Sequence, residues 1–213
     1  KPLKLTFLKD ISAPEYNQLF YQPIINYNFY DGLILGIKLH NKPILKRNLE
    51  FTFSPAYGTK SGTLTGSSSI RYNQFFEKTK IYKITYGLFG TNLHYAPNLS
   101  YTSFIPYLDI IFKRKSLRES SQESIRAKLV HIDKDVSQFS VKTPQDNYSV
   151  FSLSYNYSKP DIIKEIRYSF SAEFAKNFSK VAADFRFRSL TTSDTQLDFR
   201  IFAGAFLNNT MSS

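Results

Sequence analysis

The sequence predicts an all-β fold in which about ten or more antiparallel strands follow one another as hairpins. Three observations lead to this class. Apolar and polar residues alternate along most of the chain, many of the alternating segments are long, and short turn sequences separate them without a crossover helix. Successive side chains of a strand point to opposite faces, so each segment has one apolar and one polar face.

The alternation is clearest in two neighbouring segments. Residues 166–175 place Ile, Tyr, Phe, Ala and Phe on one parity, and Arg, Ser, Ser and Glu alternate with them. Residues 181–188 repeat the pattern, with Val, Ala, Phe and Phe against Ala, Asp, Arg and Arg. Lys176-Asn177 between them predicts a tight hairpin. Such a pair needs apolar cover on one side, from a second sheet or from lipid.

The first thirty residues differ from the rest and are interpreted as a lead-in to the main sheet. Lys4 to Leu8 predicts a short strand, and Asp10 to Asn17 predicts a turn or helical corner. Phe20 to Tyr30 is extended and apolar, with Pro23 inside it. The predicted organisation is therefore a lead-in at 1–30 followed by the barrel sheet at 31–213.

From Gly32 onward the remaining strands are predicted in series. Alternating residues predict strands at 33–40, 49–57, 70–72, 82–88, 99–114, 124–141, 151–157, 166–175, 181–188 and 197–203. Polar, Gly and Pro residues predict the turns or loops between them at 41–43, 95–98, 116–122, 143–147, 158–161, 176–177 and 191–194. Leu207 to Ser213 is expected to be a loop, with further strands following in the full protein.

Strand length favours a membrane barrel over a soluble sandwich. Sandwich strands usually have about 5–6 residues, whereas a tilted strand crosses a bilayer with about 10. No apolar run reaches the roughly 18–20 residues that a membrane helix requires. A closed barrel also pairs every backbone polar group within the protein, as lipid demands. The fold predicted is thus an antiparallel up-and-down transmembrane β-barrel, incomplete in this segment.

The two faces of that barrel are assigned by parity, because a charge on the lipid face costs about 2–4 kcal/mol at mid-depth. Side chains predicted to face lipid are Phe151, Leu153, Tyr155, Tyr168, Phe170, Phe174, Phe185, Phe187, Phe199 and Ile201. Charged side chains predicted to face the lumen are Arg126, Lys128, Arg167, Glu173, Asp184, Arg186, Arg188, Asp198 and Arg200. These charges either neutralise one another or form an anion-selective path, and mutual neutralisation is favoured.

Composition excludes several kinds of site. The chain has no Cys, so a disulfide framework, a Cys-ligated zinc site and a thiol nucleophile are all excluded. Its three histidines, His40, His94 and His131, lack metal-binding spacing, and no Gly-x-Ser-x-Gly elbow or phosphate loop occurs. His131, Asp133 and Asp135 share a parity, but a solvated strand end is favoured there over a weak cation site. No catalytic, cofactor or metal residue is therefore predicted.

The chain is basic, with 28 Lys and Arg against 17 Asp and Glu and a formal net charge of +11. Nucleic acid, lipid head groups and lipopolysaccharide are the anionic partners that such a charge suggests. A nucleic-acid platform needs aromatic and basic side chains on one face. Here they alternate on opposite faces, so nucleic acid is not expected and anionic outer-membrane lipid is.

Several segments carry a family resemblance. Residues 7–11, 14–18 and 23–33, together with 61–66 and 95–99, resemble the C-terminal region of large gluzincin-type, zinc aminopeptidase-like proteins of Bacteroidota. That resemblance implies an outer-membrane β-barrel preceded by an N-terminal peptidase domain. The His-Glu-x-x-His zinc helix of such proteins has no match here, so no metallopeptidase residue is carried over and the activity of a parent chain stays open.

The expected function is a barrel of the bacterial outer membrane that anchors a peptidase-like N-terminal domain and docks other outer-membrane or periplasmic proteins. Two alternatives stay open: a barrel that conducts solutes through its lumen, and a soluble β-barrel or sandwich that binds a small ligand. An enzyme with its site in this segment has no motif to support it.

Overall fold

A computed structural model describes residues 1–11, 13–45, 47–116, 118–136, 147–191 and 195–210. These residues form twelve strands and no helix, which confirms the all-β class. The strands belong to one mostly antiparallel sheet, in sequence order from β1 to β12. The sheet is not closed in the described part of the chain. No helix of the described residues is long and apolar enough to cross a membrane.

Most of the strands are long. The first six are β1 (Leu3–Phe7), β2 (Asn17–Asn28), β3 (Gly32–His40), β4 (Leu49–Gly58), β5 (Leu64–Phe75) and β6 (Ile81–Ala96). The others are β7 (Leu99–Phe112), β8 (Gln122–Lys134), β9 (Tyr148–Lys159), β10 (Lys164–Ala175), β11 (Phe178–Leu190) and β12 (Gln196–Asn209). All but β1, β3 and β4 have 12 residues or more, so they exceed the roughly 5–6 residues typical of globular sheets.

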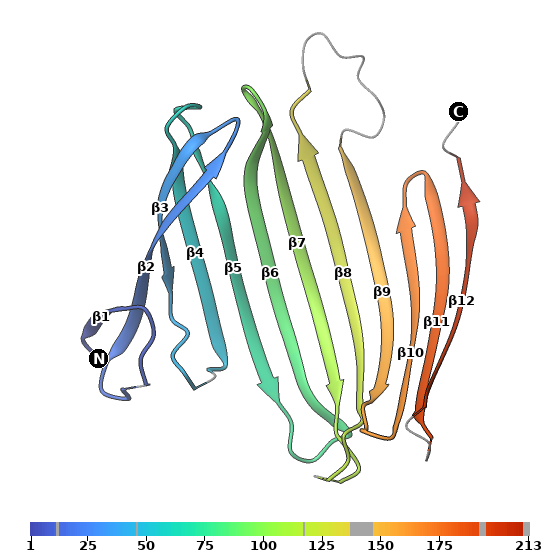
Figure 1. Ribbon diagram of the computed structural model, residues 1–213. Coiled ribbons are helices and arrows are strands. Elements are labelled where there is room, and N and C mark those ends of the chain that lie inside the picture. Colours follow the sequence, from blue (N-terminus) through green and yellow to red (C-terminus); the bar gives the residue numbers. More distant parts are fainter. Residues whose placement is uncertain (12, 46, 117, 137–146, 192–194, 211–213) are drawn as a thin grey trace. The chain divides into compact units, whose positions relative to one another are not determined.

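The chain divides into two compact units. Unit 1 comprises Lys1–Asn73, Tyr86–Pro106 and His131–Tyr148. Unit 2 comprises Gln74–Thr85, Tyr107–Val130 and Ser149–Ser213. Strands β2 to β5 form successive antiparallel hairpins in unit 1, and β9 to β12 do the same in unit 2 (Figure 1).

The predicted all-antiparallel meander is wrong at its beginning. Strand β1 pairs with β2 in parallel, with Leu3 opposite Asn17 and Phe7 opposite Tyr21. The first residue of β2 therefore lies beside the first residue of β1, and Leu8 takes a positive φ of 63° as it leaves β1. Alternation alone carries no information on strand direction, so the sequence signal was the same for either arrangement.

Pro23 is accommodated because it lies beyond the end of β1. The β1 register stops at Tyr21, and among the described residues β2 is paired beyond that point with β3 alone. Proline cannot donate a backbone hydrogen bond and is found on edge strands for this reason. Residues 1–30 thus contribute two strands to the sheet.

Other strand predictions are confirmed with shifted boundaries. The hairpin at Lys176-Asn177 is confirmed between β10 and β11. Leu207 was expected in a terminal loop, but β12 continues to Asn209 because β11 still pairs with it there, after a register shift at Ser179/Lys180. The predicted turns at 143–147 and 191–194, and the end of the 124–141 strand, lie largely outside the described residues.

Close packing between β3 and β4 depends on Gly36. A Cβ added to Gly36 would lie 2.4 Å from the carbonyl oxygen of Pro55 and 2.7 Å from Cβ of Ala56. We expect Gly36→Ala to lower the free energy of unfolding by about 1–3 kcal/mol, because the strands must separate to admit the methyl group. Chemical denaturation would measure this. Gly90→Ala is the matched control, since its nearest neighbour would be 3.6 Å away; an equal loss in both variants would contradict the packing argument.

Candidate functional site

The charged residues predicted from the sequence gather on one face of β10–β12. Cross-strand partners in an antiparallel sheet share a face. The register places Arg167 opposite Arg186, and Arg186 opposite Arg200. Three arginines therefore lie side by side across three adjacent strands. We call this surface the arginine face; its members are Glu165, Arg167, Glu173, Lys180, Asp184, Arg186, Arg188, Asp198 and Arg200.

Carboxylates interleave with these arginines. Asp184 lies between two of them, with Nε of Arg186 donating at 3.1 Å and Nε of Arg200 donating at 3.0 Å. Nε of Arg188 donates to Asp198 at 2.7 Å. Two further ion pairs join Arg167 to Glu165, and Lys180 to Glu173 at 3.0 Å. Each cation of the arginine face thus has an acidic partner.

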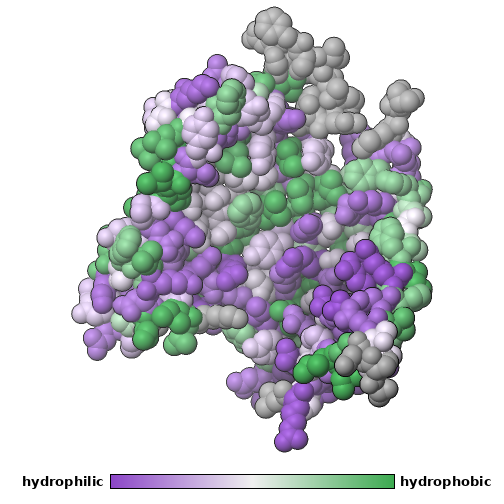
Figure 2. Space-filling view, viewed as in Figure 1, coloured by the Kyte–Doolittle hydropathy of each residue, from purple (hydrophilic) through white to green (hydrophobic). Residues whose placement is uncertain are grey.

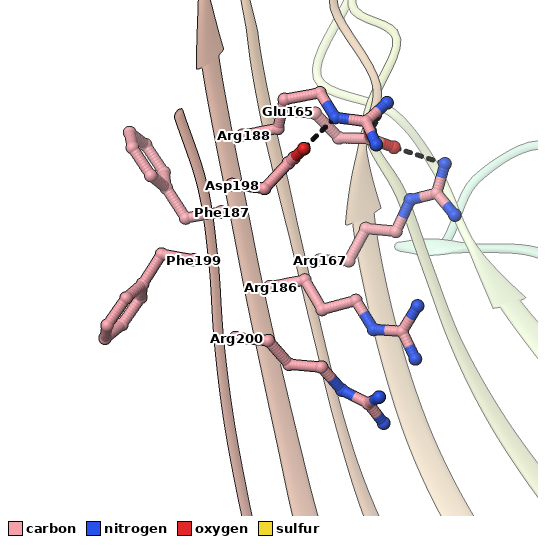
Figure 3. Close-up of a pocket in the computed structure, with 8 residues that line it drawn as sticks. All are labelled: Glu165, Arg167, Arg186, Phe187, Arg188, Asp198, Phe199 and Arg200. Carbon is pink, nitrogen blue, oxygen red and sulfur yellow. Dashed lines mark hydrogen bonds and ion pairs between the residues drawn. The ribbon is translucent and has the colours of Figure 1, made fainter. Parts of the chain in front are cut away.

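The aromatic residues of the same strands point the other way. In Figure 3 the four arginine side chains extend to one side of the sheet, whereas Phe187 and Phe199 extend to the opposite side. These two phenylalanines are cross-strand partners, as are Phe185 and Ile201. Because side chains alternate along a strand, these phenylalanines lie on the face opposite to the arginines.

The register continues this apolar surface onto β9 and β10. It pairs Phe151 with Phe174, Leu153 with Ala172, and Tyr155 with Phe170. The ring centroids of Tyr157 and Tyr168 lie 4.7 Å apart in a stacked arrangement. The ten side chains predicted to face lipid therefore share one face of β9–β12, here called the apolar face.

Two further charges of the predicted set lie on β8. Nε of Arg126 donates to Oδ1 of Asp109 on β7 at 2.5 Å, and its Nη2 donates to Oδ2 at 2.9 Å. This two-bond contact again joins a cation to a carboxylate. Lys128 is two residues further along β8 and hence on the same face.

A shallow recess of about 470 Å³ lies over the arginine face. Four arginines and two acids line it, and Asp184 adds a third carboxylate beside them. The recess is therefore close to charge-balanced, and its arginines are already engaged by carboxylates. Such a surface holds neighbouring strands together and stays hydrated; it has little free charge for a ligand.

Strand pairing at the arginine face should depend on Asp184. Replacing it with Asn leaves Arg167, Arg186 and Arg200 directly opposite one another with one neutralising charge fewer. We expect Asp184→Asn to lower stability at low ionic strength and to lose most of this effect near 1 M salt, where screening acts within about 3 Å. Urea denaturation at two salt concentrations would measure it. The double variant Asp184→Asn/Arg200→Gln restores the charge balance and should recover stability; no recovery would refute the account.

The segment around His131 does not gather into a cation site. Asp135 instead accepts hydrogen bonds from the backbone N–H and the hydroxyl of Ser100, at 2.9 and 2.7 Å. These bonds stabilise the carboxylate and lower the pKa of Asp135 from its ordinary value. Among the described residues, no group of three His, Cys, Asp or Glu side chains could hold a metal ion.

Sequence analysis missed two polar clusters of unit 1. The first is a larger recess, of about 800 Å³, lined by Lys9, Lys38, His40 and Lys42. Its signal was present, since Lys38, His40 and Lys42 share one parity at the end of β3. The second is built on Asp31, whose side chain is fully buried and lies 2.7 Å from Nδ1 of His94. These two residues are far apart in the sequence, so no local pattern could have joined them.

Comparisons with known proteins found no match for this chain. No family model matches the chain, and neither a curated protein nor a solved structure matches it.

Proposed function

We propose that this chain is a membrane-spanning β-barrel domain of a bacterial outer membrane. In this proposal the apolar face contacts lipid, and the arginine face lines a hydrated lumen. The observation that carries it is the distribution of burial. Apolar side chains of long strands are exposed on one face, while most of the buried side chains among the described residues are polar.

Burial is inverted relative to a water-soluble fold. Among the described residues, the buried hydrophobic ones are Phe20, Ile34 and Ala56, whereas the buried polar or charged ones number ten. On the apolar face, Phe170 is 54% exposed and Ile201 is 53% exposed. A soluble sheet buries such residues in a core, and contiguous exposed apolar patches mark interaction surfaces or membrane contact. Lipid supplies cover for this face without a second protein layer.

Unit 1 repeats the same inversion. Leu35 of β3 faces Tyr57 of β4 across the sheet, and both are nearly half exposed. The alternate residues of these strands include Ser54 and His40, which are buried. Each unit, taken by itself, thus exposes apolar side chains on one face of its strands.

The polar face also has the composition of a wet lumen. In the view of Figure 2, strongly hydrophilic side chains gather over the lower part of β10–β12, with hydrophobic ones above them. On β12, Phe202 lies opposite Asp184 and Phe206 lies opposite Lys180, so this face also carries two aromatic side chains. A polar, charged interior is a feature of outer-membrane barrels.

The anchoring role is proposed on the sequence resemblance to gluzincin-type proteins. In that role the barrel holds an N-terminal peptidase-like domain at the membrane, and lipopolysaccharide and neighbouring membrane proteins are its partners. A second candidate function is a solute-conducting pore, and the recesses on the polar face are the observation that supports it. Single-channel recording separates the two, since an anchor with a filled lumen gives no conductance steps.

Membrane insertion can be tested by folding the purified full-length protein into phospholipid vesicles. We expect strands to form only in the presence of lipid or detergent, and the folded protein to resist extraction by carbonate. A monodisperse, folded protein in detergent-free buffer would overturn the membrane proposal and leave the soluble ligand-binding sheet in its place.

A further inference from the structure

The polar face of β2–β5 in unit 1 contains a recess whose charge is not balanced. It encloses about 800 Å³ and is lined by Lys9, Lys38, His40 and Lys42 together with hydroxyl-bearing residues. None of its described lining residues is Asp or Glu. Among the described residues, no carboxylate lies within ion-pair distance of any of the three lysines.

Strand register brings these groups together. Lys38 on β3 lies opposite Gln22 on β2, and His40 lies opposite Thr52 on β4. The hydroxyl-bearing residues extend across the next hairpin, where Ser54 lies opposite Ser67 and Thr52 opposite Ser69. Lys9 and Lys42 come from the segments that flank β2 and β3 at the same end. Phe89 of β6 completes the lining, so the recess is built by five adjacent strands and two loops.

Three lysines line this recess, and their positive charges repel one another. The pKa of Lys42 is lowered from its ordinary value, first by burial and then by the positive charge of Arg71, with Lys38 and Lys9 acting in the same sense. The negative charge of Glu50 acts in the opposite sense on the pKa of Lys42, but its carboxylate forms an ion pair with Arg71. Each cation of the arginine face has an acidic partner, whereas no described residue that lines the recess in unit 1 is acidic.

His40 adds an oriented donor. The backbone N–H of Lys42 donates to Nδ1 of His40 at 3.2 Å, so in the neutral ring the hydrogen is on Nε2. The ring is 3% exposed and stacks on Phe20, with centroids 5.4 Å apart. These two contacts hold the imidazole in place. Lysine, imidazole and hydroxyl groups together form a site rich in donors and poor in acceptors.

We propose that this recess binds the phosphate group of a soluble phosphorylated solute. Three lysines match an anion of two or more charges, and hydroxyl groups can donate to its remaining oxygens. Lysine is a common phosphate ligand because its ammonium group acts as a compact point charge. A lipid head group carries the same chemistry, but the recess lies on the face opposite the exposed apolar residues. A free phosphate ester therefore fits the location better than a lipid does.

The test uses calorimetric titration of the purified full-length protein with inorganic pyrophosphate, in parallel with dihexanoyl phosphatidic acid. We expect saturable pyrophosphate binding that weakens with added salt. The variant Lys38→Gln/Lys42→Gln should weaken it at least about tenfold, since a hydrogen bond to a charged group is worth more than that factor. Lys9→Gln, a change in an exposed loop, should weaken it by a smaller factor without affecting the fold.

Lys128→Gln is the matched control, because it removes a lysine from the polar side of β8 in unit 2. It should leave pyrophosphate binding unchanged. Equal weakening in this control, or no weakening in the recess variants, would overturn the proposal, as would binding of the phosphatidic acid alone. The titration is made on the protein folded in detergent, so a failure to bind pyrophosphate there would leave the proposed barrel intact.

Discussion

Replacing Phe170 with Arg is expected to destabilise the protein folded in a bilayer by about 2–4 kcal/mol if the residue lies near mid-depth. Phe170 is at the middle of β10, with Tyr155 and Ala183 as its cross-strand partners, and it is more than half exposed. In water, a charge at so exposed a position has little effect on stability. In lipid, the guanidinium loses its hydration. The sign and size of the change in stability therefore show whether the apolar face contacts water or lipid.

The measurement is urea-induced unfolding of the protein in phospholipid vesicles, followed by tyrosine fluorescence. Ser171→Arg is the matched control, since Ser171 is the next residue and faces the polar side, opposite Ser154 and Ala182. We expect the control to stay within about 0.5 kcal/mol of the parent protein. If both variants are equally stable, the apolar face does not contact lipid.

Asp31→Ala is expected to lower the free energy of unfolding by about 3 kcal/mol, through loss of a buried acceptor. Oδ1 of Asp31 accepts a hydrogen bond from the hydroxyl of Ser61 at 2.8 Å and lies 2.7 Å from Nδ1 of His94. Oδ2 accepts from the side-chain amide of Asn28 at 3.2 Å. One carboxylate thus joins the β2–β3 turn, the β4–β5 turn and the end of β6.

Thermal and chemical unfolding of the protein in detergent would measure this loss. Asp31→Asn keeps one acceptor oxygen and should show a smaller loss than Asp31→Ala. Asp161→Ala is the control at an exposed turn, where the carboxylate accepts a local bond from the backbone N–H of Ile162. A loss at Asp31 no larger than at Asp161 would show that the turns are held together by their backbone bonds alone.

Local patterning predicted much of this fold because a strand has a fixed period. The hairpin of β10 and β11 followed from two alternating runs around Lys176-Asn177, and the partition of Arg186 from Phe187 followed from parity alone. Both depend on neighbours in sequence. The parallel pairing of β1, in contrast, depends on where the segment Leu8–Tyr16 returns the chain, and no period encodes that direction.

The polar sites were likewise predictable only as far as they depend on neighbours in sequence. The arginine face was predictable because each of its strands carries its own charges on one parity. Which carboxylate neutralises which arginine was not, since Asp184 meets Arg200 only through the β11–β12 register. The contact of Asp31 with His94 joins residues on β6 and a distant turn.

By itself the sequence determined the strands and the chemistry of their two faces, because side-chain direction alternates with every residue. Only the tertiary structure decided which strands are neighbours, and therefore which charges are paired. That pairing distinguishes the arginine face of unit 2, where each cation has an acidic partner, from the recess in unit 1, where no described lining residue is a carboxylate. The physical reason is range: alternation is a property of adjacent residues, whereas charge balance depends on residues that register brings together from separate strands.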